Sequence, residues 1–292
     1  MLSLHWHYYL FSFALFIFIR FLLSFVRTKS KPSFEEAVIS GGEGEDDELN
    51  NWHLGLNCEH VPLQFEKCSK NESVKRSHDY YELMNKRRTV RHFSTETFPI
   101  EVLYNVIKTA GNCFSIFLSV LKRVLKGTSP SGAHTEPWKF AIVKSQAIKE
   151  NIRQIVEEQE EVNYKKRMGK QWVNDLKFLR TFWVKEYITD APYLILVFKK
   201  MYSIDNNGRK QLHYYSEQSV NIAAGMVLAA IQNAGLVSLT STPLNCGPAL
   251  KTLLNRPSEE KLAFLLPVGY PSEDCTVPNL KRKSLDELMT LY

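Results

Sequence analysis

Residues 193–198 read YLILVF, six consecutive apolar side chains that predict a buried strand. Downstream of this run, residues 217–233 predict a long helix, which Gly235 is placed to end. Two further strands are expected at 237–240 and 262–268. Because helices and strands alternate irregularly, the sequence predicts an α+β or mixed α/β domain.

The residues upstream of this run fit the same class of fold. A short helix is expected near Ser77, in HDYYELMNKRR, and Pro99 is placed to start a second helix with apolar residues at helical spacing. The stretch KFAIVK, after Trp138, predicts a short strand. Helices are also expected at 147–164 and 172–187, and no internal repeat is present.

The first part of the chain predicts a membrane anchor at 1–31. Residues 8–26 form a nineteen-residue apolar run that is interrupted only by Arg20. Such a run is long enough for a transmembrane helix, because a bilayer core is roughly 30 Å thick and a helix rises about 1.5 Å per residue. A cleaved signal peptide is the alternative, but its apolar region is normally shorter and follows a positively charged N-terminus.

Positive charges follow the apolar run, at Arg27, Lys29 and Lys31. Basic residues that flank a membrane span stay on the cytoplasmic side, so we expect a single-pass N-terminal anchor with the folded domain in the cytosol. Residues 32–76 contain GGEGEDDE and few regularly spaced apolar positions, which predicts a flexible acidic linker. The folded domain is therefore expected at 77–292.

Composition argues against two classes of function. The chain has 37 Lys and Arg against 31 Asp and Glu, a net charge of +6, but the acidic run at 43–48 interrupts any continuous basic face. No nucleic-acid partner is therefore predicted. The five cysteines are scattered and include no C-x-x-C pair, so neither a disulfide framework nor a zinc ribbon is indicated. We expect no metal site, and a reducing compartment.

Common nucleotide and hydrolase motifs are absent from the sequence. The chain lacks G-x-G-x-x-G after a strand, the phosphate loop G-x-x-x-x-G-K-[ST] and G-x-S-x-G, so any cofactor is held by another device. The run RRTVR at 87–91 offers three arginines whose forked donors suit a phosphate. A second basic cluster, KRK, lies at 281–283. Each cluster also fits a solvated basic patch.

Two polar loops adjoin predicted strands. PSGAHTEPW at 130–138 precedes one strand, and its Pro and Gly residues fix a turn in which Ser and backbone N–H groups can hydrogen-bond a cofactor. TSTPLNCG at 240–247 follows another strand, and its consecutive hydroxyls can either meet the polar edge of a ligand or cap a turn. Taken alone, each stretch is an ordinary loop.

Together these stretches resemble the nitroreductase superfamily and, within it, the iodotyrosine deiodinases. The resemblance rests on NKRRTVRHFS, PSGAHTEPW, EEQEEVNYKKRMGKQWV, WVKEY, NAGLVSLTSTPLNCGP, LLPVGYP and VPNLKRKSLD. The arginine and serine stretches occur across nitroreductases, whereas EEVNYKKRMG followed by WVKEY resembles the amino-acid-binding lid of the deiodinases. The resemblance extends from about residue 77 to the C-terminus. It implies a nitroreductase-like α+β fold, with a central mixed sheet flanked by helices, and FMN as the cofactor.

The resemblance assigns roles to individual residues. Its FMN-binding positions correspond to Arg87, Arg88, Thr89, Val90, Arg91, Ser131, Thr240, Ser241, Thr242 and Arg282. Thr242, placed at flavin N5, is the implied catalytic residue. The implied substrate-binding residues are Ala133, Glu160, Tyr164 and Lys185. Glu160 and Tyr164 are four apart, so a helix presents both on one face; the carboxylate can accept from an ammonium group, while Lys185 can pair with a carboxylate.

The implied activity is FMN-dependent reductive dehalogenation of mono- and diiodotyrosine, which gives tyrosine and iodide. NADPH is the expected ultimate electron source, and because the chain has no dinucleotide motif, a separate NADPH-dependent reductase is expected to deliver the electrons. We expect a homodimer, because nitroreductase-like sites lie at the subunit interface and the small residues of 217–233 offer a close-packing face. Two alternatives remain: a general nitroreductase or flavin reductase, and a catalytically silent halotyrosine-binding membrane protein.

One segment departs from the family pattern. Between Gly111 and Thr128 the chain carries an atypical insertion at 112–127, NCFSIFLSVLKRVLKG, where the deiodinases run almost directly into the serine-containing loop. The insertion can form an amphipathic stretch that needs cover or a membrane. A retained intron or a faulty gene model is the alternative. Because the insertion adjoins the FMN loop, disruption of that loop is the route to a silent protein.

Overall fold

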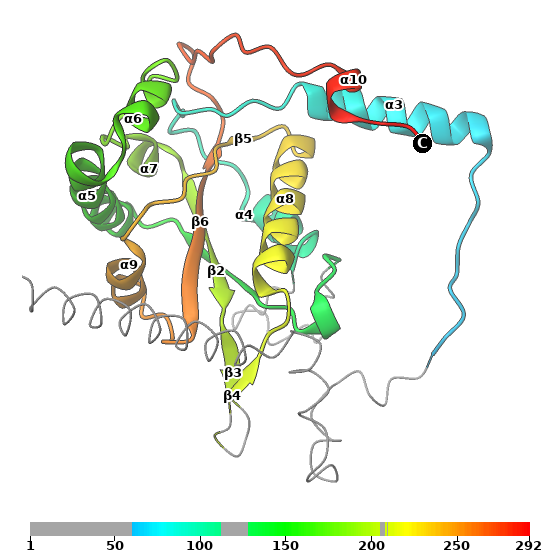
Figure 1. Ribbon diagram of the computed structural model, residues 1–292, viewed down its shortest axis with the longest axis horizontal. Coiled ribbons are helices and arrows are strands. Elements are labelled where there is room, and N and C mark those ends of the chain that lie inside the picture. Colours follow the sequence, from blue (N-terminus) through cyan, green and yellow to red (C-terminus); the bar gives the residue numbers. More distant parts are fainter. Residues whose placement is uncertain (1–59, 112–127, 205–207, 209) are drawn as a thin grey trace, which may run out of the picture. The chain divides into compact units, whose positions relative to one another are not determined.

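A computed structural model describes the chain at 60–111, 128–204, 208 and 210–292. The expected anchor at 1–31 and the insertion at 112–127 lie outside these residues. Within the described ranges, no helix combines the length and the apolar character needed to cross a bilayer. The chain divides into two compact units, Met1–Leu63 and Gln64–Tyr292, and the second contains every described helix and strand (Figure 1).

The centre of the domain is a four-stranded sheet with the strand order β1-β2-β6-β5 (Figure 1). Its strands are β1 (Trp138–Val143), β2 (Tyr193–Lys200), β6 (Glu260–Gly269) and β5 (Val237–Ser238). The pairings between these strands are antiparallel. The four predicted strands are therefore confirmed. β5 is shorter than 237–240 because the regular ladder stops at Ser238 and continues only as a bridge between Ser241 and Leu265.

The parallel pairing expected of a mixed sheet comes from the segment that contains the arginine run. Thr89 forms an isolated parallel bridge with Ser238, and the N–H of Val90 donates to the Ser238 carbonyl at 3.2 Å. The run RRTVR therefore extends along β5. This pairing places it next to the hydroxyl-rich segment that follows β5.

Helices cover both faces of the sheet and make a three-layered domain. On one face lie α4 (Ile100–Lys108) and α8 (Ser216–Asn233); on the other lie α5 (Gln146–Val162), α7 (Tyr187–Asp190) and α9 (Gly247–Leu253) (Figure 1). Alternate side chains of β2 enter the two cores: Ile195 and Val197 pack with α4 and α8, whereas Leu194 and Leu196 pack with α5, α7 and α9. A strand covered on both faces is continuously apolar, which explains why YLILVF predicts it.

The first described helix begins earlier than expected. α3 spans Lys70–Asn85, so the last residues of the expected linker at 32–76 are helical. The helix buries none of its residues, and local contacts stabilise it instead. The Ser69 side chain caps it by accepting from the N–H of Glu72, whose carboxylate pairs with Arg76. A helix without an apolar stripe leaves no periodic signal, which explains the difference.

The prediction of a helix at 172–187 is wrong for the second half of that range. α6 (Lys170–Lys177) ends early, and irregular chain follows it as far as α7. Arg180 has a positive φ of 50°, which interrupts helical geometry. The N–H of Lys185 donates at 2.6 Å to the side chain of Glu157 on α5, so a tertiary contact takes the place of a helical one.

The remaining described elements are short. They are the 3₁₀ turn η3 (Gly132–His134), the π-helical turn η4 (Asn163–Arg167), the hairpin strands β3 (Tyr202–Ile204) and β4 (Lys210–Leu212), and α10 (Leu285–Leu288). Beside α4, the hydroxyl of Thr128 donates to the carbonyl of Thr109 at 2.5 Å. The residues on the two sides of the insertion are therefore in contact, and the domain is continuous across that point.

Candidate functional site

A cationic cluster forms where the arginine run meets the C-terminal segment. Arg88 donates to the carbonyl of Pro278, which holds the chain that leads to Arg282 beside the run. Burial lowers the pKa of Arg87, and the neighbouring charges of Arg282 and Arg88 lower it further. Among the residues that the structure describes, none of these arginines forms an ion pair with a carboxylate. Adjacent guanidinium groups of this kind suit a phosphate.

Not every residue of the run faces this cluster. Val90 is 4% exposed and packs into the core that α5, α7 and α9 cover, so its side chain supports the run from beneath. Arg87, Arg88, Thr89 and Arg91 are all partly exposed. Alternation along the extended segment thus separates one buried apolar residue from the polar residues on either side of it.

The hydroxyl segment 240–242 continues from β5 along β6. Ser241 exchanges two backbone hydrogen bonds with Leu265, at 3.0 and 2.8 Å. Its hydroxyl accepts from the phenol of Tyr187 at 3.2 Å. These contacts fix the backbone of the segment, whereas the side chains of Thr240 and Thr242 are exposed and available to a ligand.

Thr242 borders a cavity of about 350 Å³. Val220 and Asn221 of α8 line the same cavity, together with Lys261 and Phe264 of β6. The predicted catalytic residue is therefore at an accessible surface beside the sheet. The arginine run lies beside β5, from which the hydroxyl segment continues, and Arg282 acts on Arg87, but none of these arginines lines the cavity at Thr242.

The lid residues Glu160, Tyr164 and Lys185 also come together. The ammonium of Lys185 lies 3.5 Å from Oε2 of Glu160, and the two side chains are only 7% and 12% exposed. The same ammonium donates to the carbonyl of Phe182 and lies 5.5 Å from the centre of the Tyr164 ring. The acid, phenol and amine therefore lie together, although α5 supplies only Glu160: Tyr164 comes from the π-helical turn after α5, and Lys185 from irregular chain.

Arg91 joins the arginine run to the lid. Burial has the largest effect on the pKa values of its neighbours: it raises those of Tyr164 and Tyr187 and lowers that of Lys185. The positive charge of Arg91 lowers the pKa of all three groups. Arg91 therefore acts electrostatically on each of them. The end of the arginine run is thus electrostatically coupled to the lid residues Tyr164 and Lys185.

Asn163, which the sequence analysis did not single out, holds Glu160 in place. It begins the π-helical turn η4 (Asn163–Arg167) and is 0% exposed. Its amide group donates to Oε1 of Glu160 at 3.2 Å and to the carbonyl of Leu244 at 3.3 Å. Its oxygen accepts from Arg167 at 3.1 Å and from Asn245 at 3.2 Å. The amide therefore makes all four of its possible hydrogen bonds, and these bonds connect the lid to the chain that follows the hydroxyl segment.

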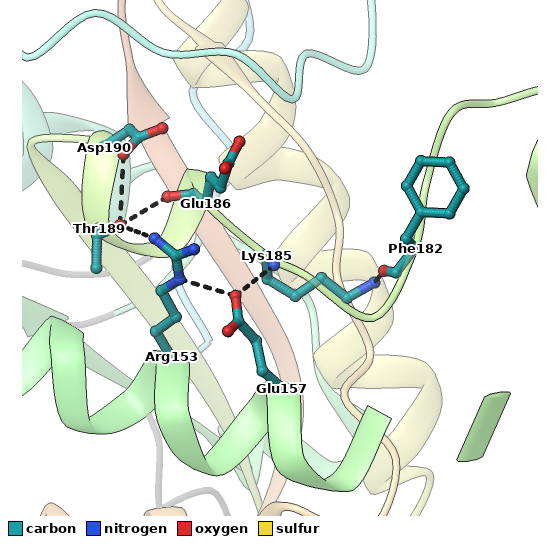
Figure 2. A network of polar contacts seen from close by, with 7 residues as sticks. All are labelled: Arg153, Glu157, Phe182, Lys185, Glu186, Thr189 and Asp190. Carbon is teal, nitrogen blue, oxygen red and sulfur yellow. Dashed lines mark hydrogen bonds and ion pairs between the residues drawn. The ribbon is translucent and has the colours of Figure 1, made fainter. Parts of the chain in front are cut away.

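Glu157 is a second contributing residue that the sequence did not indicate. It is part of a charged stretch that reads as a solvated helix face, but Figure 2 shows it directed at the segment that carries Lys185. One carboxylate oxygen accepts from the Lys185 N–H at 2.6 Å and from Nε of Arg153 at 2.7 Å. Nη1 of Arg153 donates to the hydroxyl of Thr189 at 2.9 Å. No local sequence signal marks these contacts.

Ser131 and Ala133 do not join the arginine cluster within one chain. The N–H of Gly132 lies 3.4 Å from the hydroxyl of Ser219, near the start of α8. By contrast, α3, which leads into the arginine run, contacts α8 through a bond from Gln232 to the Leu83 carbonyl. Ser219 and Gln232 lie roughly 20 Å apart along the helix at about 1.5 Å per residue. One chain therefore holds the predicted site in two separate parts.

The loop that contains Ser131 and Ala133 has an unusual backbone. Ala133 and His134 have positive φ values of 47° and 53°, and Glu136 has one of 43°. The hydroxyl of Ser131 accepts from the N–H of Glu136 at 3.1 Å and stabilises the turn. Non-glycine residues rarely take this conformation, and such strain is typical of ligand-binding loops. Ala133 is exposed, so this part of the loop is accessible to a ligand.

Residues 84–270 match the model of the Nitroreductase family. The chain is 56% identical to iodotyrosine deiodinase 1 of Homo sapiens, over 90% of this chain and 86% of that protein. It is 54% identical to iodotyrosine deiodinase of Hydra vulgaris, over 80% of this chain and 79% of that protein. A solved structure of oxidized iodotyrosine deiodinase, bound to FMN and 3-iodo-L-tyrosine, has a TM-score of 0.59 and 32% identity, and the match covers 73% of this chain and 98% of that chain.

Proposed function

This chain belongs to the nitroreductase family and, within it, to the iodotyrosine deiodinases, and from that premise we propose how its own residues carry out the reaction. The protein is an FMN-dependent oxidoreductase that removes iodine reductively from iodotyrosine. The structural observation that supports this function most directly is the buried pair of Glu160 and Lys185 beside Tyr164. Those groups complement the head of an amino acid, and they adjoin the predicted flavin residues.

FMN is held by residues that the fold brings to one edge of the sheet. Arg87 and Arg282 bind its phosphate, because their positive charges repel each other in the free protein and together suit a doubly charged anion. Arg91 and the exposed hydroxyls of Thr240 and Thr242 bind the polar parts of the flavin. When bound and reduced, FMN supplies the two electrons that, with one proton, replace the carbon–iodine bond by a carbon–hydrogen bond and release iodide.

Glu160 binds the ammonium group of the halotyrosine, and Lys185 binds its carboxylate. The ion pair between the two side chains satisfies both charges. The substrate ammonium can replace the Lys185 ammonium as the partner of Glu160. The substrate carboxylate can likewise replace Glu160 as the partner of Lys185, so the exchange leaves no buried charge unpaired. Because both groups are shielded from solvent, a phenol without the amino-acid head binds much less tightly.

The second part of the site comes from a second copy of the chain. The loop that contains Ser131 and Ala133 contacts α8 roughly 20 Å, at about 1.5 Å per residue, from the point where α3 contacts it. The loop therefore completes the site of a second chain, beside that chain's arginine run. α8 also exposes Ile222, and a Cβ added at the exposed Gly225 would meet nothing within 4 Å. A second chain can therefore approach this helix closely. These observations support a homodimer in which each copy completes the site of the other.

Electrons reach the protein from NADPH through a separate reductase, because the sequence contains no dinucleotide-binding motif. The apolar run 8–26 supports an N-terminal membrane anchor. The basic residues that follow this run support a cytosolic location for the catalytic domain.

The direct test is iodide release by the full chain, purified in mild detergent, with dithionite as the electron donor. A yellow protein that releases iodide from 3-iodotyrosine supports the proposed roles. A yellow protein that reduces a nitroaromatic compound but spares iodotyrosine would be a general nitroreductase. A colourless protein that binds iodotyrosine would be catalytically silent.

A further inference from the structure

One face of α5 carries a polar stripe that is longer than the lid. Its members are Lys149, Arg153, Glu157 and Glu160, followed by Tyr164 in the π-helical turn. Successive members are three or four residues apart, so they share one side of the helix. The first two members bind α7 and the chain after it: Lys149 donates to the carbonyls of Thr189 and Ala191, and Arg153 donates to the Thr189 hydroxyl.

Glu157 lies between the part of the stripe that binds backbone and the part that binds the lid. It accepts the Lys185 N–H at 2.6 Å, while Glu160, one turn further along, pairs with the Lys185 ammonium at 3.5 Å. Lys185 is therefore held at both ends by one helix. The chain from 178 to 186 forms no regular helix or strand. The contact with the Glu157 side chain therefore fixes the position of the Lys185 backbone.

Arg153 gives Glu157 a different role from Glu160. The Nε of Arg153 donates at 2.7 Å to the same oxygen that accepts from Lys185, and Figure 2 shows both dashed contacts meeting there. The two side chains are 28% and 26% exposed. Glu157 pairs with Arg153 and with the lysine main chain, whereas the lysine ammonium pairs with Glu160, so the two carboxylates hold different parts of Lys185.

We propose that Glu157 is a positioning residue that fixes the backbone of Lys185, so that the lysine ammonium can change partner from Glu160 to the substrate carboxylate without movement of the chain. This inference rests on the proposed role of Lys185 in binding the amino-acid head. The charge-assisted bond survives when the ammonium changes partner, because it involves only the main chain of Lys185. Preorganisation of this kind reduces the entropic cost of binding.

The test compares two substrates of the full-length, FMN-loaded protein. 3-Iodotyrosine carries the amino-acid head, and 2-iodophenol carries only the halogenated ring. Glu157→Ala should raise the KM for 3-iodotyrosine about tenfold, with a smaller change in kcat, because an ordered lysine is lost. The kcat/KM for 2-iodophenol should not change. Glu157→Gln keeps an acceptor for the N–H and should restore most of the affinity. Glu158→Ala, at the exposed neighbouring glutamate, is the matched control.

A second pair of variants separates this inference from the proposed function. Lys185→Ala should itself raise the KM for 3-iodotyrosine, and adding Glu157→Ala should then have no further effect. If Lys185→Ala has no effect, the proposed role of the lysine is wrong, and the inference falls with it. If Lys185→Ala raises the KM but Glu157→Ala does not, or if both substrates suffer equally, the inference alone is overturned. Should Glu157→Ala lose FMN, Glu157→Asp decides instead: its acceptor is withdrawn by about 1.5 Å, one carbon–carbon bond, and it should raise the same KM.

Discussion

The phenol of Tyr187 donates to the hydroxyl of Ser241 across 3.2 Å and so joins α7 to the hydroxyl segment after β5. Burial raises the pKa of Tyr187 to about 12. In an unfolded chain a tyrosine ionises near pH 10, so between these pH values the folded state keeps a proton that the unfolded state loses. The resulting stability is fully present below pH 10 and is lost as the pH rises toward 12.

Tyr187→Phe should remove this pH dependence. Between pH 10 and pH 12 the unmodified protein should lose up to about 2–3 kcal/mol more unfolding free energy than the variant. At pH 7 the variant should be less stable by about 1 kcal/mol, because one largely buried hydrogen bond is missing. Urea denaturation across the pH range measures both effects. Parallel profiles for the two proteins would contradict the prediction.

Glu160→Gln should weaken the binding of iodotyrosine far more than that of FMN. The amide has the shape of the carboxylate but not its charge, so the ammonium of Lys185 and that of the substrate both lose a shielded partner. The expected cost is roughly 2–5 kcal/mol of binding free energy. Quenching of flavin fluorescence gives the affinity for each ligand. Equal losses for the two ligands would refute the lid assignment.

Asn163→Ala should reduce both stability and iodotyrosine affinity. It leaves Oε1 of Glu160 and the carbonyl of Leu244 without the amide that binds them, at a cost of about 1–3 kcal/mol of unfolding free energy. Asn245→Gly is the control, because it removes one bond from an exposed donor while glycine accepts the positive φ of 64° at this position, and it should cost about 0.5 kcal/mol or less. Chemical denaturation compares the two variants. Similar losses would show that Asn163 has no special role.

Arg282→Ala should lower the affinity for FMN roughly tenfold or more, because a charge-assisted bond to the phosphate is lost. Lys283→Ala, which changes the charge of the chain equally at the next exposed residue, should have a much smaller effect. Titration of the FMN-free protein at low and high salt measures both. The loss at Arg282 should shrink as the salt concentration rises. Equal behaviour of the two variants would exclude a specific phosphate contact.

Deletion of 112–127 should leave FMN binding intact. Thr109 and Thr128 already share a hydrogen bond, and after the deletion they would be three residues apart, which is the spacing of a tight turn. Absorbance near the flavin bands and thermal denaturation compare the shortened and full-length proteins. A shortened protein that cannot retain FMN would show that the insertion contributes to the fold.

The sequence by itself determined the features whose signal is local. β2 is predictable because burial on both faces makes it continuously apolar. α8 is predictable because small and apolar residues run to Gly235, whose positive φ of 74° ends it. The arginine run and the Glu160–Tyr164 pair are likewise recognisable, because their members lie within one turn or one short strand of each other.

Only the tertiary structure decided how these parts meet. Glu157 and the N–H of Lys185 are 28 residues apart, and Arg88 and the carbonyl of Pro278 are 190 apart. Such contacts leave no periodic pattern in the chain, because a carboxylate on a helix looks the same whether it faces water or a distant N–H. The separation of Ser131 from Arg87 is equally invisible in sequence. It depends on which end of α8 each loop contacts, and the packing of the helices against the sheet fixes that.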